Sequence, residues 1–430
     1  MTHPRPRVLI IAEAANPEWV SVPLVGWSLA SALREVADVH LVTQVRNRDA
    51  ILRAGLIEGQ DFTAIDSERF AKPMWALAEK LRMGDGKGWT IVQAVNALSY
   101  PYFERLVWRR FGPAITRGDY DIVHRVTPLS PTSPSSLARK CAAVGVPFVL
   151  GPLNGGVPWP EAFDHIRRAE KEFLAPLRRV YKLLPGASAT LDHASAILAG
   201  SRYTASEIPE RHQHKTLWLP ENGIDPKRFN RRATPADGPL RVCFIGRLVP
   251  YKGPDMLLDA AADLLREGRM RLDLVGDGPM MPELRAQAER LGIGAAVTFH
   301  GWQAHDRVQD VLCQSHLFAF PSIREFGGGV VLEAMALGVP PLIVDYAGPG
   351  ELVDNTTGIK VPIGSRDQIV ADFRRELTRL TEAPDRLAPL AETAFQRVQD
   401  AFLWSRKAEQ IAKVYRWVGS GQPAPKPHLL

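Results

Sequence analysis

Cysteine is scarce in this chain, and no two cysteines stand close together. The 430 residues contain three, Cys141, Cys243 and Cys313, and none belongs to a CxxC pair. This spacing argues against a disulfide framework and against a cysteine-bound metal cluster, and it favours a reducing compartment.

Long apolar runs are also missing. No uninterrupted apolar stretch approaches the roughly 18 residues that a membrane span needs. The first apolar run begins at Val8 and is cut by Glu13, so we interpret it as a buried strand rather than a signal peptide. The sequence therefore predicts a cytoplasmic protein.

Positive charge is in excess in only one half of the chain. Residues 1–220 contain 27 basic and 21 acidic residues, whereas residues 221–430 contain 26 of each. The excess suggests an anionic partner for the first half, either a membrane surface or an acidic substrate, and ordinary surface variation is the alternative. We expect no nucleic-acid partner.

One basic segment is amphipathic. Residues 165–186 place apolar residues on one face and arginine and lysine on the other, a pattern typical of helices that rest on anionic lipid at the inner face of a membrane. The alternative is a helix packed on its own domain with a solvated basic face, and Pro176 interrupts a continuous amphipath.

Short apolar runs alternate with helical patterns along the whole chain, which predicts an α/β fold. The expected strands are residues 7–12, 38–43, 121–126, 146–150, 195–199, 241–246, 271–276, 296–299, 317–320 and 340–344. Strands of this kind separated by helices form parallel sheets that are covered on both faces. Helical sequence at 61–117 interrupts the first half.

The length favours two domains rather than one. Residues 220–239 are rich in proline, glycine, asparagine and charge, and a new strand follows them. We therefore expect one doubly wound domain over residues 1–222, a second over residues 223–401, and a ligand cleft between them. Residues 421–430 are predicted to be a disordered tail.

A candidate anion site follows the first strand of the second half. In the stretch CFIGRLVPYKGP, Arg247 and Lys252 flank a loop, and Gly253-Pro254 then opens a helix. Two cations beside a helix N-terminus are suited to phosphate. Two unrelated surface bases are the alternative.

The next strand ends in the turn GDGP, in which Gly276 and Gly278 would let backbone approach a ligand closely. This turn is not the GxGxxG of dinucleotide-binding enzymes, and the turn after the first strand of the chain contains no glycine. A nicotinamide-dependent dehydrogenase is therefore disfavoured.

The stretch REFGGGVVLEAMA places two carboxylates, Glu325 and Glu333, around a glycine run. The amides of Gly327, Gly328, Gly329 and Val330 would lie at a helix N-terminus, where they can bind phosphate oxygens. Carboxylates accept hydrogen bonds from vicinal hydroxyls, so one could bind a sugar and the other a ribose. Phosphate and two diols together describe a nucleoside-diphosphate sugar.

Taken together, these motifs and the NGID at 222–225 resemble family 4 of the retaining glycosyltransferases, which has the GT-B fold of two Rossmann-like domains facing across a cleft. The resemblance covers most of the second half. It implies that Arg247 and Lys252 hold the donor diphosphate, that Glu333 binds the ribose, and that Glu325 contacts the donor sugar. Glu325 matches the family by its distance from Glu333, because the more common Glu-x-Phe-Gly is here Glu-Phe-Gly.

In the first half, the resemblance places an active-site histidine at His124, in DIVHRVTP, and a facing acceptor loop at Asn154, Gly155 and Gly156. The alternative for His124 is a buried, hydrogen-bonded core histidine. The resemblance also implies that a helix over residues 402–420 returns to the first domain.

Metal-binding patterns are weak. The DYD at 119–121 leads into a buried strand, and His212 and His214 lie in a loop, so we expect neither a metal nor a bound cofactor.

We therefore expect a hexosyltransferase with a glycan, polysaccharide or lipid-linked acceptor. The alternatives are a GT-B sugar-nucleotide epimerase, a pyridoxal-phosphate phosphorylase and a non-catalytic nucleotide-binding assembly partner.

Overall fold

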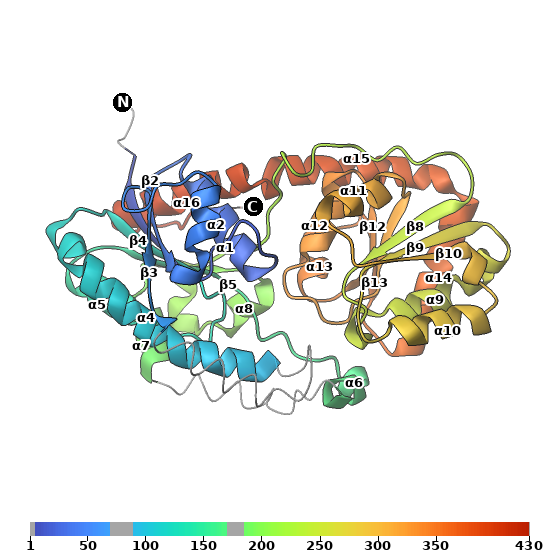
Figure 1. The fold of residues 1–430 in the computed structure, drawn as a ribbon, viewed down its shortest axis with the longest axis horizontal. Helices are drawn as coiled ribbons and strands as arrows, with labels where there is room; N and C mark the ends of the chain where they lie inside the picture. Colours follow the sequence, from blue (N-terminus) through green and yellow to red (C-terminus); the bar gives the residue numbers. More distant parts are fainter. Residues whose placement is uncertain (1–4, 69–88, 170–184, 430) are drawn as a thin grey trace. The chain divides into compact units, whose positions relative to one another are not determined.

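A computed structural model describes residues 5–68, 89–169 and 185–429 (Figure 1). The chain divides into two compact units. Unit 1 comprises Met1–Gly156, Arg168–Glu221 and Trp404–Leu430, and unit 2 comprises Val157–Arg167 and Asn222–Leu403. The prediction of a boundary near residue 222 agrees with this division, but residues 157–167 belong to unit 2 rather than to the first domain.

Unit 1 is built on a seven-stranded sheet with the order β3-β2-β1-β4-β5-β6-β7, in which all pairs are parallel. Its strands are β1 (Arg7–Ala12), β2 (Asp38–Gln44), β3 (Phe62–Ile65), β4 (Ile122–Thr127), β5 (Phe148–Leu153), β6 (Ala196–Ala199) and β7 (Thr216–Trp218). Its helices are α1 (Val22–Leu33), α2 (Arg48–Arg53), α4 (Trp89–Arg117), α5 (Ser136–Ala143), α7 (Pro185–His193), α8 (Arg202–Glu207) and α16 (Trp404–Gly419), with 3-10 turns η1 (Val45–Asn47) and η4 (Glu210–Lys215).

The two faces of this sheet bury separate apolar clusters. Leu29 of α1 and Ile411 of α16 pack against one face, and Phe103 of α4 and Leu137 of α5 pack against the other. A parallel sheet covered on both faces needs apolar residues throughout each strand, which is why β1 and β4 are buried along nearly their whole length.

Unit 2 has a six-stranded parallel sheet with the order β10-β9-β8-β11-β12-β13. Its strands are β8 (Leu240–Ile245), β9 (Met270–Val275), β10 (Val297–Gly301), β11 (Leu317–Phe320), β12 (Pro341–Asp345) and β13 (Ile359–Pro362). Its helices are α9 (Pro254–Arg266), α10 (Met281–Arg290), α11 (His305–Cys313), α12 (Gly329–Ala336), α13 (Ala347–Leu352), α14 (Arg366–Glu382) and α15 (Leu387–Arg397), while α6 (Asp164–Ala169) straddles the unit boundary. The short turns are η2 (Glu161–Phe163), η5 (Pro250–Lys252), η6 (Gly294–Ala296), η7 (Pro384–Arg386) and the π-helical η8 (Val398–Phe402).

The ten predicted strands are all present within a few residues of their expected bounds. The sequence missed β3, β7 and β13, and β3 begins inside the segment 61–117 that was read as helical. Within that segment α4 is helical, whereas residues 69–88 lie outside the described part of the chain. Most of the basic segment 165–186 also lies outside it, because residues 170–184 are not described.

The prediction of a disordered tail is wrong. Trp417 Nε1 donates to the carbonyl of Pro423 at 2.7 Å, and Lys426 Nζ donates to the carbonyl of Thr216 at 2.6 Å. Leu429 is only 7% exposed and joins the apolar cluster of unit 1. Proline and glycine suggested disorder, but these three anchors hold the segment against unit 1.

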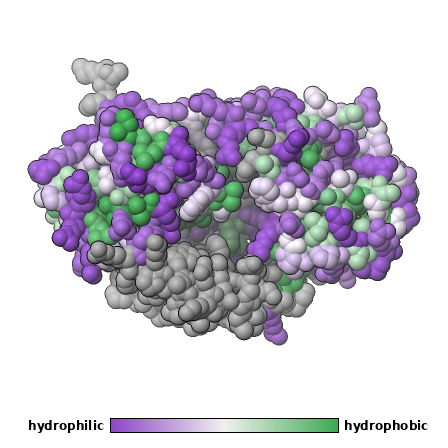
Figure 2. All heavy atoms as spheres, viewed as in Figure 1, coloured by the Kyte–Doolittle hydropathy of each residue, from purple (hydrophilic) through white to green (hydrophobic). Residues whose placement is uncertain are grey.

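The visible face carries mainly hydrophilic residues, with small apolar patches between them (Figure 2). Among the described residues, no helix is both long enough and apolar enough to span a bilayer.

Candidate active site

Unit 2 changes direction between β8 and β11. The chain moves outward from β8 through β9 to β10 on one side, and from β11 through β12 to β13 on the other. In doubly wound sheets, ligands bind at the carboxyl ends of the strands beside such a switch point. The loops that follow β8 and β11 carry Arg247, Lys252 and Glu325, the polar residues that the sequence singled out.

Lys252 and Glu325 meet at this switch point. Lys252 Nζ lies 2.6 Å from Glu325 Oε2, and their side chains are 17% and 21% exposed. The ammonium group also lies 5.2 Å from the ring centroid of Phe320, at the end of β11. Because both side chains are largely buried and form an ion pair, the ammonium group of Lys252 and the carboxylate of Glu325 hold each other in position.

Arg247 lies on the same loop but points into solvent. It is exposed, and its guanidinium makes no hydrogen bond with any described residue. The structure thus provides one anchored cation, Lys252, and one that is free to turn toward a ligand.

The glycine run leads into α12 as the sequence predicted. Gly328 is the N-cap, with the left-handed φ of 59°, and Gly329 is the first helical residue. Within the described residues, the amides of Gly328, Gly329 and Val330 donate to no backbone acceptor. The helix N-terminus, including the loop amide of Gly327, therefore presents a group of donors suited to an anion.

Glu333 lies about one turn into α12 and is partly buried. Burial raises its pKa from 4.5 to about 7, and the positive charge of Arg228 opposes this rise. Arg228 lies in the segment at residues 220–239, before β8. It was not singled out from the sequence, because nothing in the local sequence indicates that its charge acts on Glu333 of α12. Near neutral pH, the carboxyl is thus divided between its two protonation states.

Gly276 and Gly278 are explained by contacts within the protein. A Cβ on Gly276 would lie 1.9 Å from the carbonyl oxygen of Gly246, and one on Gly278 would lie 2.4 Å from that of Leu248. That these glycines also let backbone approach a ligand stays a prediction. They allow the turn after β9 to pack against the loop that carries Arg247, and so fix that loop.

His124 is a buried histidine with both ring nitrogens occupied. Nδ1 is 2.7 Å from the hydroxyl of Tyr415, and Nε2 is 2.7 Å from the carbonyl of Gly151. Its exposure is 0%, and burial lowers its pKa from 6.5 to about 4. The geometry supports the structural alternative, because no ring nitrogen remains for a substrate.

The buried His124 makes stability depend on pH. Below pH 6.5 the unfolded chain takes up a proton at this residue, whereas the folded chain does so only near pH 4. Its contribution is therefore complete above pH 6.5 and is lost as pH falls toward 4. We expect the free-energy difference between the parent chain and His124→Phe, measured by urea unfolding, to shrink by about 2.5 kcal/mol from pH 7.5 to 4.5. A difference independent of pH would contradict this assignment.

The acceptor loop of the prediction is tied into unit 1. Asn154 Nδ2 donates to Glu221 Oε1 at 2.6 Å, and its Oδ1 accepts from the amide of Gly155 at 2.8 Å. Gly155 and Gly156 both have positive φ, at 142° and 79°. Asn154 therefore shapes the loop, and its amide is not free for an acceptor.

The DYD segment has a structural explanation. Asp121 pairs with Arg7 at 2.7 Å and accepts from its backbone amide, joining the starts of β4 and β1. His212 Nε2 lies 3.0 Å from Asp192. No set of three potential metal ligands gathers anywhere in the described part of the chain.

Comparison with known families gives one match in unit 2. Residues 226–393 match the model of the family described as glycosyl transferases group 1.

Curated relatives match part of the chain. The D-inositol 3-phosphate glycosyltransferase of Rhodococcus erythropolis is 38% identical over 188 residues, which is 42% of this chain and 41% of that protein. The alpha-D-kanosaminyltransferase of Streptomyces kanamyceticus is 32% identical over 223 residues, 50% of this chain and 56% of that protein. The matches thus span about half the length of these relatives or less.

Solved structures match over nearly the whole chain. Anabaena HepE in complex with UDP and glucose gives a TM-score of 0.60 at 18% identity and covers 96% of this chain and 100% of its own. The sucrose-phosphate synthase of Thermosynechococcus elongatus gives 0.59 at 18% identity, with 97% and 100% covered. These likenesses establish the GT-B fold, and residues 226–393 of unit 2 are similar to the glycosyl transferases group 1 family.

Proposed function

We propose that this chain is a retaining glycosyltransferase that moves a hexose from a nucleoside-diphosphate sugar to a glycan, polysaccharide or lipid-linked acceptor, without a metal ion. The observation that carries the proposal is the Lys252–Glu325 pair, 2.6 Å apart, at the switch point of a group 1 domain. The name of the Rhodococcus relative adds a small polyol phosphate, D-inositol 3-phosphate, to the acceptors worth testing.

The chemistry of the proposal follows from charge. Expelling a nucleoside diphosphate leaves negative charge on the leaving oxygen while the sugar ring becomes positive. Lys252, Arg247 and the first amides of α12 would stabilise the diphosphate, and fixed donors cost no reorganisation as the charge develops. In the absence of ligand, Glu325 holds Lys252 in place, and a bound diphosphate would compete for the same ammonium group.

The carboxylates would bind the two diols. Glu325 would accept hydrogen bonds from hydroxyls of the donor sugar, and Glu333 would do so from the ribose. Because a diphosphate can be neutralised by these cations and amides, the proposal needs no metal at the leaving group.

The first experiment is calorimetric titration of UDP, GDP, ADP and CMP into the full chain with a chelator present. We expect one nucleotide to bind, which would name the donor class. Failure of all four to bind would overturn the proposal. NMR of the product would then identify the anomeric configuration of the transferred sugar, and an epimerised nucleotide sugar formed without acceptor would favour the epimerase instead.

Glu333 gives the proposal a pH signature. If the ribose binds the ionised carboxylate, protons compete with the ligand below pH 7, because the pKa of Glu333 is about 7. We expect the affinity for the nucleotide sugar to fall by up to about tenfold per pH unit below 7. The nucleotide sugar is the suitable probe, since its diphosphate diester has no group that titrates in this range.

The matched variant for this measurement is Glu333→Gln, which keeps the shape of the side chain and cannot titrate. Its affinity should be lower than that of the parent at pH 8 and constant between pH 5.5 and 8. An equally flat profile for the parent chain would remove Glu333 from the ribose site.

A further inference from the structure

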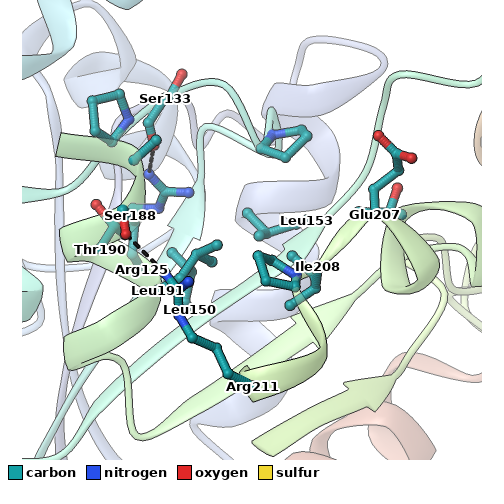
Figure 3. Close-up of a pocket in the computed structure, with 15 residues that line it drawn as sticks. Arg125, Ser133, Leu150, Leu153, Ser188, Thr190, Leu191, Glu207, Ile208 and Arg211 are labelled. Carbon is teal, nitrogen blue, oxygen red and sulfur yellow. Dashed lines mark hydrogen bonds between the residues drawn. The ribbon is translucent and has the colours of Figure 1, made fainter. Parts of the chain in front are cut away.

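Unit 1 contains a cavity of about 280 Å³, whose lining residues all belong to that unit (Figure 3). It lies between the middle of the sheet, at β4 and β5, and the segments α7 and α8. Much of its wall is apolar, and the larger apolar side chains are Leu150, Leu153, Leu191 and Ile208. A cavity of this size and lining fits a small ligand with a hydrocarbon body.

A buried arginine forms the polar part of the wall. Arg125 follows His124 on β4, so the two side chains leave opposite faces of the sheet. Arg125 is 1% exposed, and Nη1 donates to the carbonyl of Ser133 at 2.6 Å (Figure 3). The guanidinium lies 5.7 Å from the ring centroid of Tyr100, and Nε has no acceptor among the described residues.

The charge of Arg125 has no acidic partner within 4 Å in the described part of the chain. Glu104 is also fully buried, but its oxygens accept from the hydroxyl of Ser135 and from the amide and hydroxyl of Ser136. Glu207 is the acidic residue of the cavity wall. A buried cation without an anion is costly, which makes the cavity a place where an anion is stabilised.

Two hydroxyls of the wall, those of Ser188 and Thr190, already make hydrogen bonds within the protein. Ser188 Oγ donates to Asp192 at 3.1 Å and accepts from Arg211 at 2.9 Å. Thr190 Oγ1 donates to the carbonyl of Gly186 at 2.7 Å. A guanidinium has five N–H groups, and Arg125 donates one of them to the carbonyl of Ser133, so it keeps further donors for a ligand.

We propose that this cavity binds a small organic anion, with a carboxylate or phosphate paired to Arg125 and an apolar body against the leucines and Ile208. Planar oxyanions accept two parallel hydrogen bonds from a guanidinium, which adds direction to the charge pairing. The proposal does not depend on the transferase activity, since the site lies within unit 1 and its test is direct binding.

The test is calorimetric titration of the full chain with hexanoate and with hexyl phosphate. Two further probes separate the contributions to binding. Hexanol has the same hydrocarbon chain without the charge, and inorganic phosphate has the charge without the hydrocarbon chain. We expect both organic anions to bind at least tenfold more tightly than hexanol or inorganic phosphate. The tighter of the two anions names the oxyanion that the site prefers.

Arg125→Met removes the charge of the side chain and nearly keeps its volume. It should lower the affinity for both organic anions at least tenfold and leave the affinity for hexanol unchanged. Arg202→Met is the matched control, because Arg202 is an exposed arginine of unit 1 that stacks on Trp218 outside the cavity. Ala187→Phe, on α7, adds a large side chain to the cavity wall and should weaken every organic probe. Unchanged anion binding in Arg125→Met or in Ala187→Phe, or no binding of either anion to the parent at millimolar concentration, would overturn the proposal.

Discussion

Replacing Lys252 with alanine is expected to lower kcat by a factor of about 10²–10³, equivalent to about 3–4 kcal/mol of transition-state stabilisation. The ammonium group is the anchored cation of the site, held 2.6 Å from Glu325 and beside the ring of Phe320. Its removal leaves the leaving diphosphate with the amides of α12 and the solvent-exposed Arg247. The measurement is transfer from the donor that the nucleotide titration identifies.

Lys360→Ala is the matched control for this variant. Lys360 also lies in unit 2 and also pairs with a carboxylate, Asp345, at 3.0 Å, but it is on β13, at the edge of the sheet. Its loss should leave kcat within a factor of about two, because exposed ion pairs contribute little. A Lys252→Ala chain that keeps the parent's kcat would remove Lys252 from the reaction.

Replacing Gly276 with alanine is expected to cost about 4 kcal/mol of unfolding free energy. The added Cβ would lie 1.9 Å from the carbonyl oxygen of Gly246, and the φ of 136° is one that side chains rarely adopt. The backbone at both positions continues from neighbouring strands, β9 and β8, and therefore cannot move aside cheaply. Urea unfolding of the purified variant measures the loss.

Gly292→Ala separates the two causes of that loss. Gly292 also has a positive φ, 67°, but a Cβ there would meet nothing within 4 Å. It should cost only about 1–2 kcal/mol, the strain of the left-handed conformation alone. Equal losses for the two variants would mean that the contact between the turn after β9 and the loop after β8 contributes nothing.

Place in the sheets explains most of the difference between the strands that the sequence revealed and those that it missed, although the predicted β10 is also an edge strand. Interior strands such as β4 and β11 are buried on both faces and are therefore continuous apolar runs. The missed strands are all at sheet edges: β3 and β7 flank the sheet of unit 1, and β13 flanks that of unit 2. Edge strands are short and bury less of their length: of the four residues of β13, only Val361 is buried, which leaves no continuous apolar run.

The residues singled out here also differ in how far they could be predicted from the local sequence. Lys252 and Glu325 were predicted from local motifs, because each stands in a short segment between a strand and a helix. The place of His124 depends on Tyr415, almost 300 residues later in the chain, and no local pattern indicates that contact. Arg125 was overlooked for a related reason. The local sequence does not show which face of the sheet its side chain lies on, or whether a carboxylate lies close enough there to form an ion pair.

Unit 1 is assembled from segments at both ends of the chain, and this has a consequence for its folding during synthesis on the ribosome. Its sheet is encoded before residue 222, but α16 and the anchored tail, which complete one apolar face, come from residues 404–430. Unit 2 is nearly continuous in sequence and can fold as it emerges. At about 5–20 residues per second, the unfinished face of unit 1 waits for about 10–40 s until the last helix is made. Truncations that end before Trp404 should therefore leave unit 1 with exposed apolar surface and a tendency to bind chaperones, while unit 2 remains folded.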